Sequence, residues 1–276
     1  MMNERPSHSV IGEAEAKQAL SHSSLADYVV NPYLGCQHGC KYCYVQRYFR
    51  PRATPPVPWG FEVYARVNVP GLLRREAKRK AHGKVLLSSM TDAYQPLESR
   101  YRLTRSVLEC LVETGFPISI LTKSNLVLRD LDLLAKHRES EVTFSISSLD
   151  EEVYRSFEPA ATPPEKRIDA LRDILESGIR GGLFVAPHIP TAEPFDVQYK
   201  PILESASELG LHELAFDFLN YSSVMKRAIM NTYESEYPQG MAAFLGMTKN
   251  PRRYEQDWKA SIASLAGRFG IKASFV

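Results

Sequence analysis

Residues 31–44 read Asn31-Pro32-Tyr33-Leu34-Gly35-Cys36-Gln37-His38-Gly39-Cys40-Lys41-Tyr42-Cys43-Tyr44, and they hold three of the four cysteines of this 276-residue chain. The three thiols follow the spacing C-x3-C-x2-C, and a glycine precedes each of the first two. Cysteines this close together favour a loop that wraps around a sulfur-bound centre. No other stretch of the sequence concentrates such side chains, so we look for function where this loop points.

The composition is that of an ordinary globular protein. Apolar residues make up 44% of the chain, and the formal net charge of +2 is too small by itself to predict a polyanionic partner. Residues 1–8 lack the apolar core of a signal peptide, and no run approaches the ~18 apolar residues that would cross a bilayer. We therefore expect a cytoplasmic protein without membrane contact, in which clustered cysteines are metal ligands or redox groups rather than disulfides.

Short strands alternate with helices along most of the chain. The pattern predicts strands over 28–30, 63–67, 85–87, 118–121, 142–147, 182–186 and 213–219, and helices over 71–82, 100–114, 126–137, 165–177, 197–209 and 258–269. Repeated βαβ units of this kind indicate a parallel sheet. Because no dinucleotide-binding G-x-G-x-x-G is present, we predict an α/β fold with a partial (β/α)6 TIM-type barrel. A single domain would span 1–276, with an N-terminal extension over 1–26, the barrel core over 27–220 and a C-terminal extension over 221–276 that caps the barrel.

Polar residues stand where the predicted strands end. They are the cysteine loop and residues 88–92, 122–124, 145–147 and 187–188. In (β/α) barrels the active site lies at the carboxyl ends of the strands. We therefore expect these segments to converge on one mouth of the barrel.

The cysteine motif resembles the signature of the radical S-adenosylmethionine (SAM) superfamily. The wider sequence resembles the spore photoproduct lyase-like branch of that superfamily, which is often labelled DNA repair photolyase. The resemblance runs from about residue 28 to about residue 220, in the order that a barrel requires. It rests on residues 31–44, 91–98, 122–124, 144–147, 157–159, 166–170 and 185–187.

The resemblance implies one 4Fe–4S cluster bound by Cys36, Cys40 and Cys43, with an open iron that chelates SAM. It also implies that one electron, from an external donor such as flavodoxin or ferredoxin, cleaves SAM to a 5′-deoxyadenosyl radical that abstracts a substrate hydrogen. The implied SAM contacts are Tyr42 near the adenine; Ser88, Ser89 and Thr91 toward the methionine amino group; Lys123 toward the carboxylate; Ser145 and Ser147 toward the ribose or the carboxylate; Glu158 and Arg167 as polar contacts; and Ala186 and Pro187 as an apolar wall for the adenine.

One departure from the family pattern bears on the substrate. The resemblance implies a hydrogen-donating cysteine at the end of the second strand, close to where this chain has Ser88-Ser89-Met90. The remaining cysteine, Cys110, falls in the middle of a predicted helix, and we expect it in the core. Thymine-dimer repair by the lyase mechanism is therefore not expected. DNA or RNA is one hypothesis for the substrate, and a peptide, a protein or a small molecule is the alternative.

Each functional interpretation has a plainer alternative. Cys36, His38, Cys40 and Cys43 could form a closed zinc site in a non-enzymatic zinc- or nucleic-acid-binding protein. His38 could face solvent instead of supporting a metal ligand. Lys123 could be an ordinary surface lysine, and the serines at 145 and 147 could bond only to neighbouring loops. Asp92 and Glu98 could fix their own loop rather than touch a ligand.

Two cationic segments leave the same choice open. The basic run over 74–80 is either a solvated helix face or a nucleic-acid patch. The segment after residue 220 combines aromatic and cationic side chains, which form either a base-stacking surface or internal packing. These residues are Tyr221, Lys226, Arg227, Tyr233 and Tyr237.

Overall fold

The computed structural model describes residues 9–221 and 223–276, and its compact parts are two units. The first unit comprises Met1–Gly39, Val45–Thr143 and Asp173–Gly181, and the second comprises Cys40–Tyr44, Phe144–Arg172 and Gly182–Val276. The fold is mixed α/β, and its main sheet has the strand order β10-β9-β8-β7-β6-β5-β2. That sheet is open among the described residues, as in a partial barrel, so the predicted fold class is confirmed.

The elements of the main sheet are short strands, and all but the last were predicted. They are β2 (Tyr28–Val30), β5 (Val85–Leu87), β6 (Ile118–Thr122), β7 (Ser140–Ile146), β8 (Arg180–Val185), β9 (Glu213–Phe216) and β10 (Lys272–Phe275). In the first unit β2, β5 and β6 pair in parallel, and in the second unit β8, β9 and β10 do the same. Strands buried on both faces read as near-continuous apolar runs, which explains the runs at Val85–Leu87 and Tyr28–Val30.

The first unit has a second, three-stranded sheet with the order β1-β4-β3. Its strands are β1 (Val10–Ala14), β4 (Glu62–Arg66) and β3 (Tyr33–Leu34). The predicted strand at 63–67 therefore exists but lies outside the main sheet, and β1 falls in the segment 1–26 that is predicted to be an N-terminal extension. Strand β1 pairs in parallel with β4, from Val10 opposite Glu62 onward. Its backbone hydrogen bonds come from a partner about fifty residues away, which local periodicity cannot reveal.

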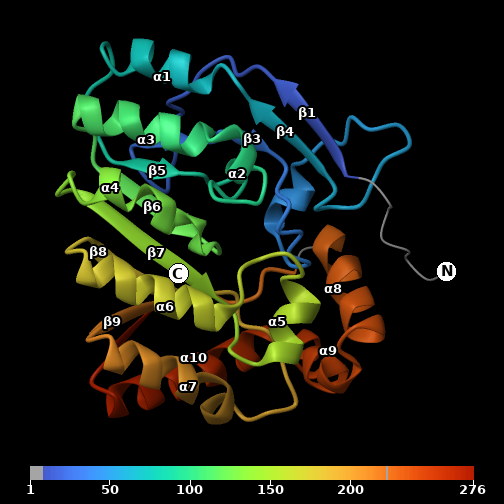
Figure 1. Cartoon of the computed structure of the whole chain (residues 1–276). Helices are drawn as coiled ribbons and strands as arrows, with labels where there is room; N and C mark the ends of the chain where they lie inside the picture. The colour runs from blue at the N-terminus through green and yellow to red at the C-terminus, as the bar shows by residue number, and fades with distance from the viewer. Residues whose placement is uncertain (1–8, 222) are drawn as a thin grey trace. The chain divides into compact units, whose positions relative to one another are not determined.

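The helices of the first unit are α1 (Val69–Glu76), α2 (Glu98–Tyr101), α3 (Leu103–Thr114) and α4 (Leu131–Leu134), with the 3-10 segment η2 (Asn125–Asp130). The 3-10 segment η1 (Tyr44–Arg47) begins with the last residue of the second unit's loop and continues in the first unit. Helices α1 and α3 lie side by side (Figure 1). The helix predicted over 100–114 is broken at Arg102, whose φ is +53°. The break has a local cause, because the buried Glu98 carboxylate accepts hydrogen bonds from the backbone N–H of Thr104 at 2.9 Å and of Arg105 at 3.3 Å.

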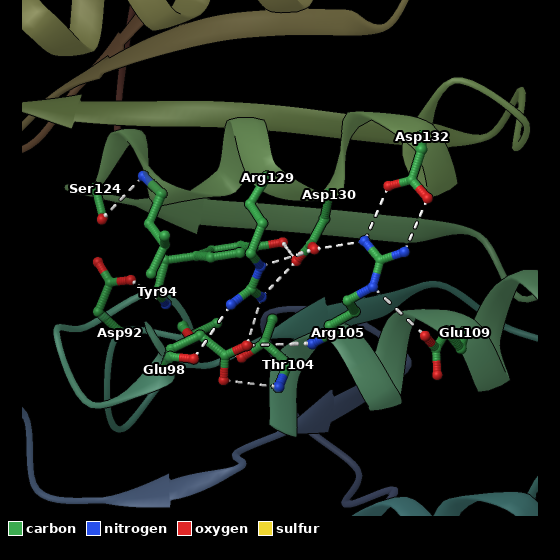
Figure 2. Close-up of polar contacts among 12 residues, drawn as sticks. Asp92, Tyr94, Glu98, Thr104, Arg105, Glu109, Ser124, Arg129, Asp130 and Asp132 are labelled. Carbon is green, nitrogen blue, oxygen red and sulfur yellow. Dashed lines mark hydrogen bonds and ion pairs between the residues drawn. The ribbon is translucent and has the colours of Figure 1, made fainter. Parts of the chain in front are cut away.

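Figure 2 shows a network of charged side chains that holds α2, α3 and η2 together. Arg129 Nη2 lies 2.6 Å from Glu98 Oε1 and 2.8 Å from Asp130 Oδ2, and Arg105 Nη1 lies 2.9 Å from Asp130 Oδ1. Tyr94 donates its hydroxyl to Asp130 at 3.1 Å. Both carboxylates are fully buried, and a buried carboxylate persists as a charge only where cations and donors surround it. The network thereby fixes the segment that carries Tyr94.

The second unit contains α5 (Glu151–Phe157), α7 (Phe195–Glu208), α8 (Ser223–Ser235), η3 (Pro238–Gly240), α9 (Met241–Lys249) and α10 (Pro251–Arg268); α6 (Pro164–Glu176) begins in it and ends in the first. Helices α7 and α10 lie side by side (Figure 1). The final strand β10 was not predicted. It pairs in parallel with β9, with Lys272 opposite Glu213, so the chain returns to the sheet after three helices. Among the described residues, no helix has the length and apolar character that spanning a membrane requires.

A buried histidine lies in the aromatic core of the second unit. Both ring nitrogens of His188 meet hydroxyls, Nδ1 at 2.7 Å from Tyr199 and Nε2 at 3.2 Å from Tyr254. The ring stacks on Phe218 and Trp258. Burial lowers the pKa of His188 to about 3, so the ring is neutral in the folded protein near neutral pH.

The neutral state of His188 predicts a pH dependence of stability. In the unfolded chain a histidine binds a proton below about pH 6.5, whereas folded His188 does not until about pH 3. The contribution of neutral His188 to the free energy of unfolding is therefore fully present above pH 6.5. Below that pH it falls by about 1.4 kcal/mol per pH unit on acidification. Urea unfolding between pH 7 and pH 4 should show that the free energy of unfolding decreases less steeply with falling pH in His188→Gln than in the wild type. The exposed His212→Gln should keep the wild-type slope, and equal slopes in all three proteins would contradict this account.

Candidate active site

The cysteine loop begins in the first unit with a turn that requires glycine. Gly35 has φ +79°, and a Cβ atom there would lie 2.2 Å from the backbone oxygen of Glu62. Gly39 also has a positive φ, +63°. Between these two turns Cys36 is buried, at 7% exposure. The glycines seen in the sequence thus allow the loop to fold back tightly against β4.

Three side chains of the segment after β5 hold this part of the loop, and we call Thr91, Asp92 and Gln95 the loop clamp. Thr91 donates its hydroxyl to the carbonyl of Gly35 at 2.6 Å. Gln95, which is fully buried, accepts the N–H of Gln37 at 2.9 Å and donates to the hydroxyl of Thr91 at 2.8 Å. The clamp therefore binds the backbone of the loop on both sides of Cys36.

Asp92 connects the loop to the end of β6. It accepts hydrogen bonds from Thr122 Oγ1 at 2.7 Å and from the backbone N–H of Lys123 at 2.8 Å, and its Oδ2 lies 3.4 Å from His38 Nδ1. Burial alone would lower the pKa of His38, but Asp92 and Cys36 raise it to about 10. Burial alone would raise the pKa of Asp92, but His38 and the donors lower it to about 2. The two side chains therefore form a buried ion pair, and His38 does not face solvent.

Gln95 offers a direct test of the clamp. Gln95→Leu keeps the side-chain size but leaves the N–H of Gln37 and the hydroxyl of Thr91 without this amide, and an unsatisfied buried group costs about 1–3 kcal/mol. We expect urea denaturation to show a loss of that size. Gln18→Leu is the matched control, because the one side-chain hydrogen bond that the described residues give Gln18 is an exposed bond to Ser21. If both variants unfold at the same urea concentration, the clamp does not hold the loop.

The predicted residues at the end of β5 face Asn31. The backbone N–H groups of Ser89 and Met90 donate to Asn31 Oδ1 at 3.0 Å and 2.9 Å. Ser88, with φ +71°, is buried. The residues predicted to approach the methionine end of SAM thus lie in a turn that Asn31, the first residue of the quoted stretch, holds in place.

In the second unit the loop continues from Cys40 to Tyr44. The backbone N–H of Lys41 donates to the carbonyl of Phe157 at 2.9 Å, and that of Cys43 donates to the carbonyl of Cys40 at 3.1 Å. Cys40 and Tyr42 are buried in the apolar cluster that includes Phe157. The C-terminal half of the loop is therefore anchored to the end of α5.

Glu158 is the centre of a buried polar group in the second unit. Its carboxylate accepts hydrogen bonds from the hydroxyl of Tyr42, from Ser147 Oγ at 2.8 Å and from Arg167 Nη2. Arg167 is fully buried and donates its Nη1 to the carbonyl of Ser145 at 2.8 Å. Burial and the negative charge of Glu158 raise the pKa of Tyr42 well above its usual value, so its hydroxyl stays protonated and donates. Burial alone would lower the pKa of Arg167, but Glu158 raises it.

The structure thus brings six predicted site residues of the second unit into one hydrogen-bonded group. Ser145 joins it by donating its hydroxyl to the carbonyl of Ala186 at 3.2 Å. The group is Tyr42, Ser145, Ser147, Glu158, Arg167 and Ala186, and Pro187 follows Ala186 directly in the chain.

The structure also bears on the aromatic residues after 220. Tyr233 and Tyr237 are buried against Phe157, which confirms the packing interpretation for these two residues.

The cysteines provide a donor set that fits an iron–sulfur cluster. All four lie in the described part of the chain, and none forms a disulfide. Cys36 and Cys40 are both 7% exposed, which suits a cluster shielded from water. Cys110 is fully buried in α3, as expected for a core thiol. The described residues show no preformed group of three His, Cys, Asp or Glu side chains placed to hold a metal ion, and the cysteine motif is shared between the two units.

Comparison with known proteins identifies the superfamily of this chain. Residues 30–196 match the radical SAM superfamily model, and the chain belongs to that superfamily. An uncharacterized protein of Methanocaldococcus jannaschii is 35% identical over 82% of this chain and 83% of its own length. Spore photoproduct lyase of Bacillus subtilis is 26% identical over 95% of this chain and 71% of its own length.

A solved structure shares the fold. It is a mutant spore photoproduct lyase with bound AdoMet and dinucleoside spore photoproduct, with a TM-score of 0.65, 20% identity and coverage of 97% of this chain and 82% of that one. The resemblance read from the motifs is therefore confirmed as to superfamily and fold.

Two features of the site were missed in the sequence. Gln95 lies in the quoted segment 91–98, but nothing about an isolated glutamine indicated that it binds the cysteine loop. Asn31 was quoted without a role, although it holds the turn after β5. Both act on the backbone of segments distant in the chain, so only the fold reveals them. The alternative that Asp92 fixes its own loop agrees with its hydrogen bond from the N–H of Tyr94, and Asp92 also reaches His38.

Proposed function

We propose that this protein is a radical SAM enzyme in which Cys36, Cys40 and Cys43 bind one 4Fe–4S cluster. The observation that carries the proposal is the C-x3-C-x2-C motif inside the segment that matches the superfamily. When bound and reduced, such a cluster supplies the electron that cleaves SAM to methionine and a 5′-deoxyadenosyl radical. Three thiolates leave one iron without a protein ligand, and an open position is the mark of a catalytic metal centre.

The protein's part is to orient the ligands and exclude water. Thr91, Asp92 and Gln95 fix the loop around Cys36, and the buried pair of Asp92 and His38 adds a charged support. Support of this kind orients metal ligands and is as important as the ligands themselves. Buried surroundings also protect a reactive intermediate from side reactions.

We assign the SAM site to the predicted contact residues, with a division of roles. Glu158 and Arg167 satisfy each other, so they frame the site, whereas Tyr42, Ser145 and Ser147 are positioned by that frame. Ala186 and Pro187 provide the apolar wall for the adenine. The contacts at the methionine end are Ser89, Thr91 and Lys123, whereas Ser88 is buried in the turn that precedes Ser89.

The identity of the bound metal distinguishes a radical SAM enzyme from a structural zinc protein. Anaerobic reconstitution with iron and sulfide should give about four irons and four sulfides per chain, as one 4Fe–4S cluster requires. The purified protein should not retain tightly bound zinc. Stoichiometric zinc that resists replacement would instead support the closed site of a structural zinc protein.

For the substrate we propose nucleic acid, with flavodoxin or ferredoxin as the electron donor. The support is the similarity to spore photoproduct lyase, one of whose solved structures holds a dinucleoside spore photoproduct. The reaction differs from that lyase's, because Ser88-Ser89-Met90 stands where a hydrogen-donating cysteine is expected. Binding to DNA or RNA at low salt that weakens steeply as salt rises would support this class. Absence of binding at low salt would favour a peptide, protein or small-molecule substrate.

A further inference from the structure

Arg66, the last residue of β4, is a partly buried cation to which the described residues give no counter-ion. The carbonyl of Asn31, 3.3 Å from Nη1, is the one acceptor that the described residues give this guanidinium. Its Nε is buried and has no hydrogen-bond partner. Buried charges in proteins are normally paired, so a guanidinium left in this state indicates an anion that is still to be supplied.

A second cation acts on Arg66. Burial lowers the pKa of Arg66, and the positive charge of Arg52 lowers it further. The guanidinium of Arg52 lies over the ring of Tyr64, 4.9 Å from its centroid. The nearby acid, Glu62, uses one oxygen for the backbone N–H groups of residues 52 and 53 and for the hydroxyl of Tyr64. Among the described residues Glu62 forms no ion pair with Arg52 or Arg66. The charges of the two arginines therefore add to one positive potential, which attracts an anion.

An unsatisfied hydroxyl lies in the turn that shares Asn31 with Arg66. Ser88 Oγ is buried and has no hydrogen-bond partner among the described residues, and the residue holds φ +71°, a left-handed conformation that is strained for most residues other than glycine. The carbonyl of Asn31 contacts Arg66, while its side chain holds the N–H groups of residues 89 and 90. One asparagine therefore ties together the strained turn and the unpaired guanidinium.

We propose that Arg66, with Arg52 and the hydroxyl of Ser88, binds an anionic group of the substrate, a phosphate or a carboxylate. The proposal rests on the proposed function for the word substrate, but the anion site rests on these residues alone. An oxyanion offers several lone pairs to a planar guanidinium fork and accepts from a hydroxyl as well. The proposed SAM contacts come from the cysteine loop and from segments around the main sheet, whereas Arg66 belongs to β4 of the three-stranded sheet. We therefore assign the anion to the substrate and not to the carboxylate of SAM.

Calorimetric titration with inorganic phosphate tests the site in the protein without its cluster, with acetate as the second probe, both at matched ionic strength. We expect phosphate to bind the wild type and to bind Arg66→Gln at least ten-fold more weakly. Arg75→Gln, which removes an exposed arginine of α1, is the matched control and should bind as the wild type does. Equal phosphate binding by Arg66→Gln and the wild type, or binding of neither phosphate nor acetate by the wild type, would overturn the proposal. If acetate binds and phosphate does not, the group is a carboxylate.

The Ser88→Gly variant tests whether the hydroxyl of Ser88 binds the anion or serves only the fold. Ser88→Gly relieves the positive φ, so we expect a higher unfolding midpoint together with weaker phosphate binding. A hydroxyl that served only the fold would not give this combination, and unchanged phosphate binding by Ser88→Gly would remove Ser88 from the site. Should Arg66→Gln fail to fold, Arg52→Gln and Ser88→Gly carry the test.

The binding of SAM distinguishes the two sources of an anion. In the reconstituted protein, Arg66→Gln should bind SAM as tightly as the wild type. Loss of SAM affinity with unchanged phosphate affinity would assign Arg66 to the cofactor and overturn the proposal. If phosphate binds as expected but the reduced protein forms no 5′-deoxyadenosine, the anion site stands and the proposed function fails.

Discussion

Replacing Cys40 with alanine is expected to reduce the formation of 5′-deoxyadenosine from SAM to background. Two thiolates, those of Cys36 and Cys43, would then remain for a cluster that needs three. The same variant should bind less iron after reconstitution, which ties the loss to the metal centre. The measurement is 5′-deoxyadenosine by chromatography after anaerobic reduction, with iron and sulfide determined on the same sample.

Cys110→Ala is the matched control, because it removes a fully buried thiol from α3 of the first unit. It should keep the wild-type iron content and the wild-type yield of 5′-deoxyadenosine, with at most a loss of stability. A Cys40→Ala protein that still cleaves SAM would refute the ligand assignment. A Cys110→Ala protein that loses iron would show that the cluster depends on a different set of thiols.

Replacing Arg167 with methionine should destabilise the protein by about 3–5 kcal/mol, the usual cost of removing one partner of a buried ion pair. Arg167 and Glu158 are 0% and 1% exposed in their side chains, so the carboxylate would be left charged and buried. The variant also removes the hydrogen bonds that Arg167 donates to the carbonyls of Ser145 and Thr162. Urea or thermal unfolding measures the loss.

Two further variants make the prediction about Arg167 specific. Arg155→Met breaks an exposed pair with Glu151 on α5 and should leave the unfolding curve unchanged. In the Glu158→Gln and Arg167→Met double variant the buried charge is gone, so part of the lost stability should return. If Arg155→Met and Arg167→Met unfold alike, the buried pair does not support the site.

The strand–helix alternation made the fold class predictable, because periodicity reflects local burial. The runs at 85–87 and 118–121 became β5 and β6, and the polar residues after them became the loop clamp and the partners of Asp92. Side chains that follow a buried strand can be located in this way without a structure. The residues that these side chains contact cannot be predicted in this way.

The features that escaped prediction depend on partners far away in the sequence. Strand β1 needs β4, and β10 needs β9, which precedes it by three helices. The break at Arg102 is an exception with a local cause, because Glu98 accepts hydrogen bonds from the residues that begin α3, and the helical pattern of 100–114 conceals it. Gln95 and Arg66 became informative only once their partners, or the lack of them, were known. Tertiary contacts override local propensity at these sites.

The most direct test of the account is whether the wild-type protein cleaves SAM. The protein is reconstituted with iron and sulfide without oxygen, reduced with dithionite and given SAM, and 5′-deoxyadenosine is counted per chain. We expect 5′-deoxyadenosine to form in the complete mixture and not when the reductant is omitted. A protein that carries a full 4Fe–4S cluster, receives the reductant and SAM, and forms no 5′-deoxyadenosine would contradict it.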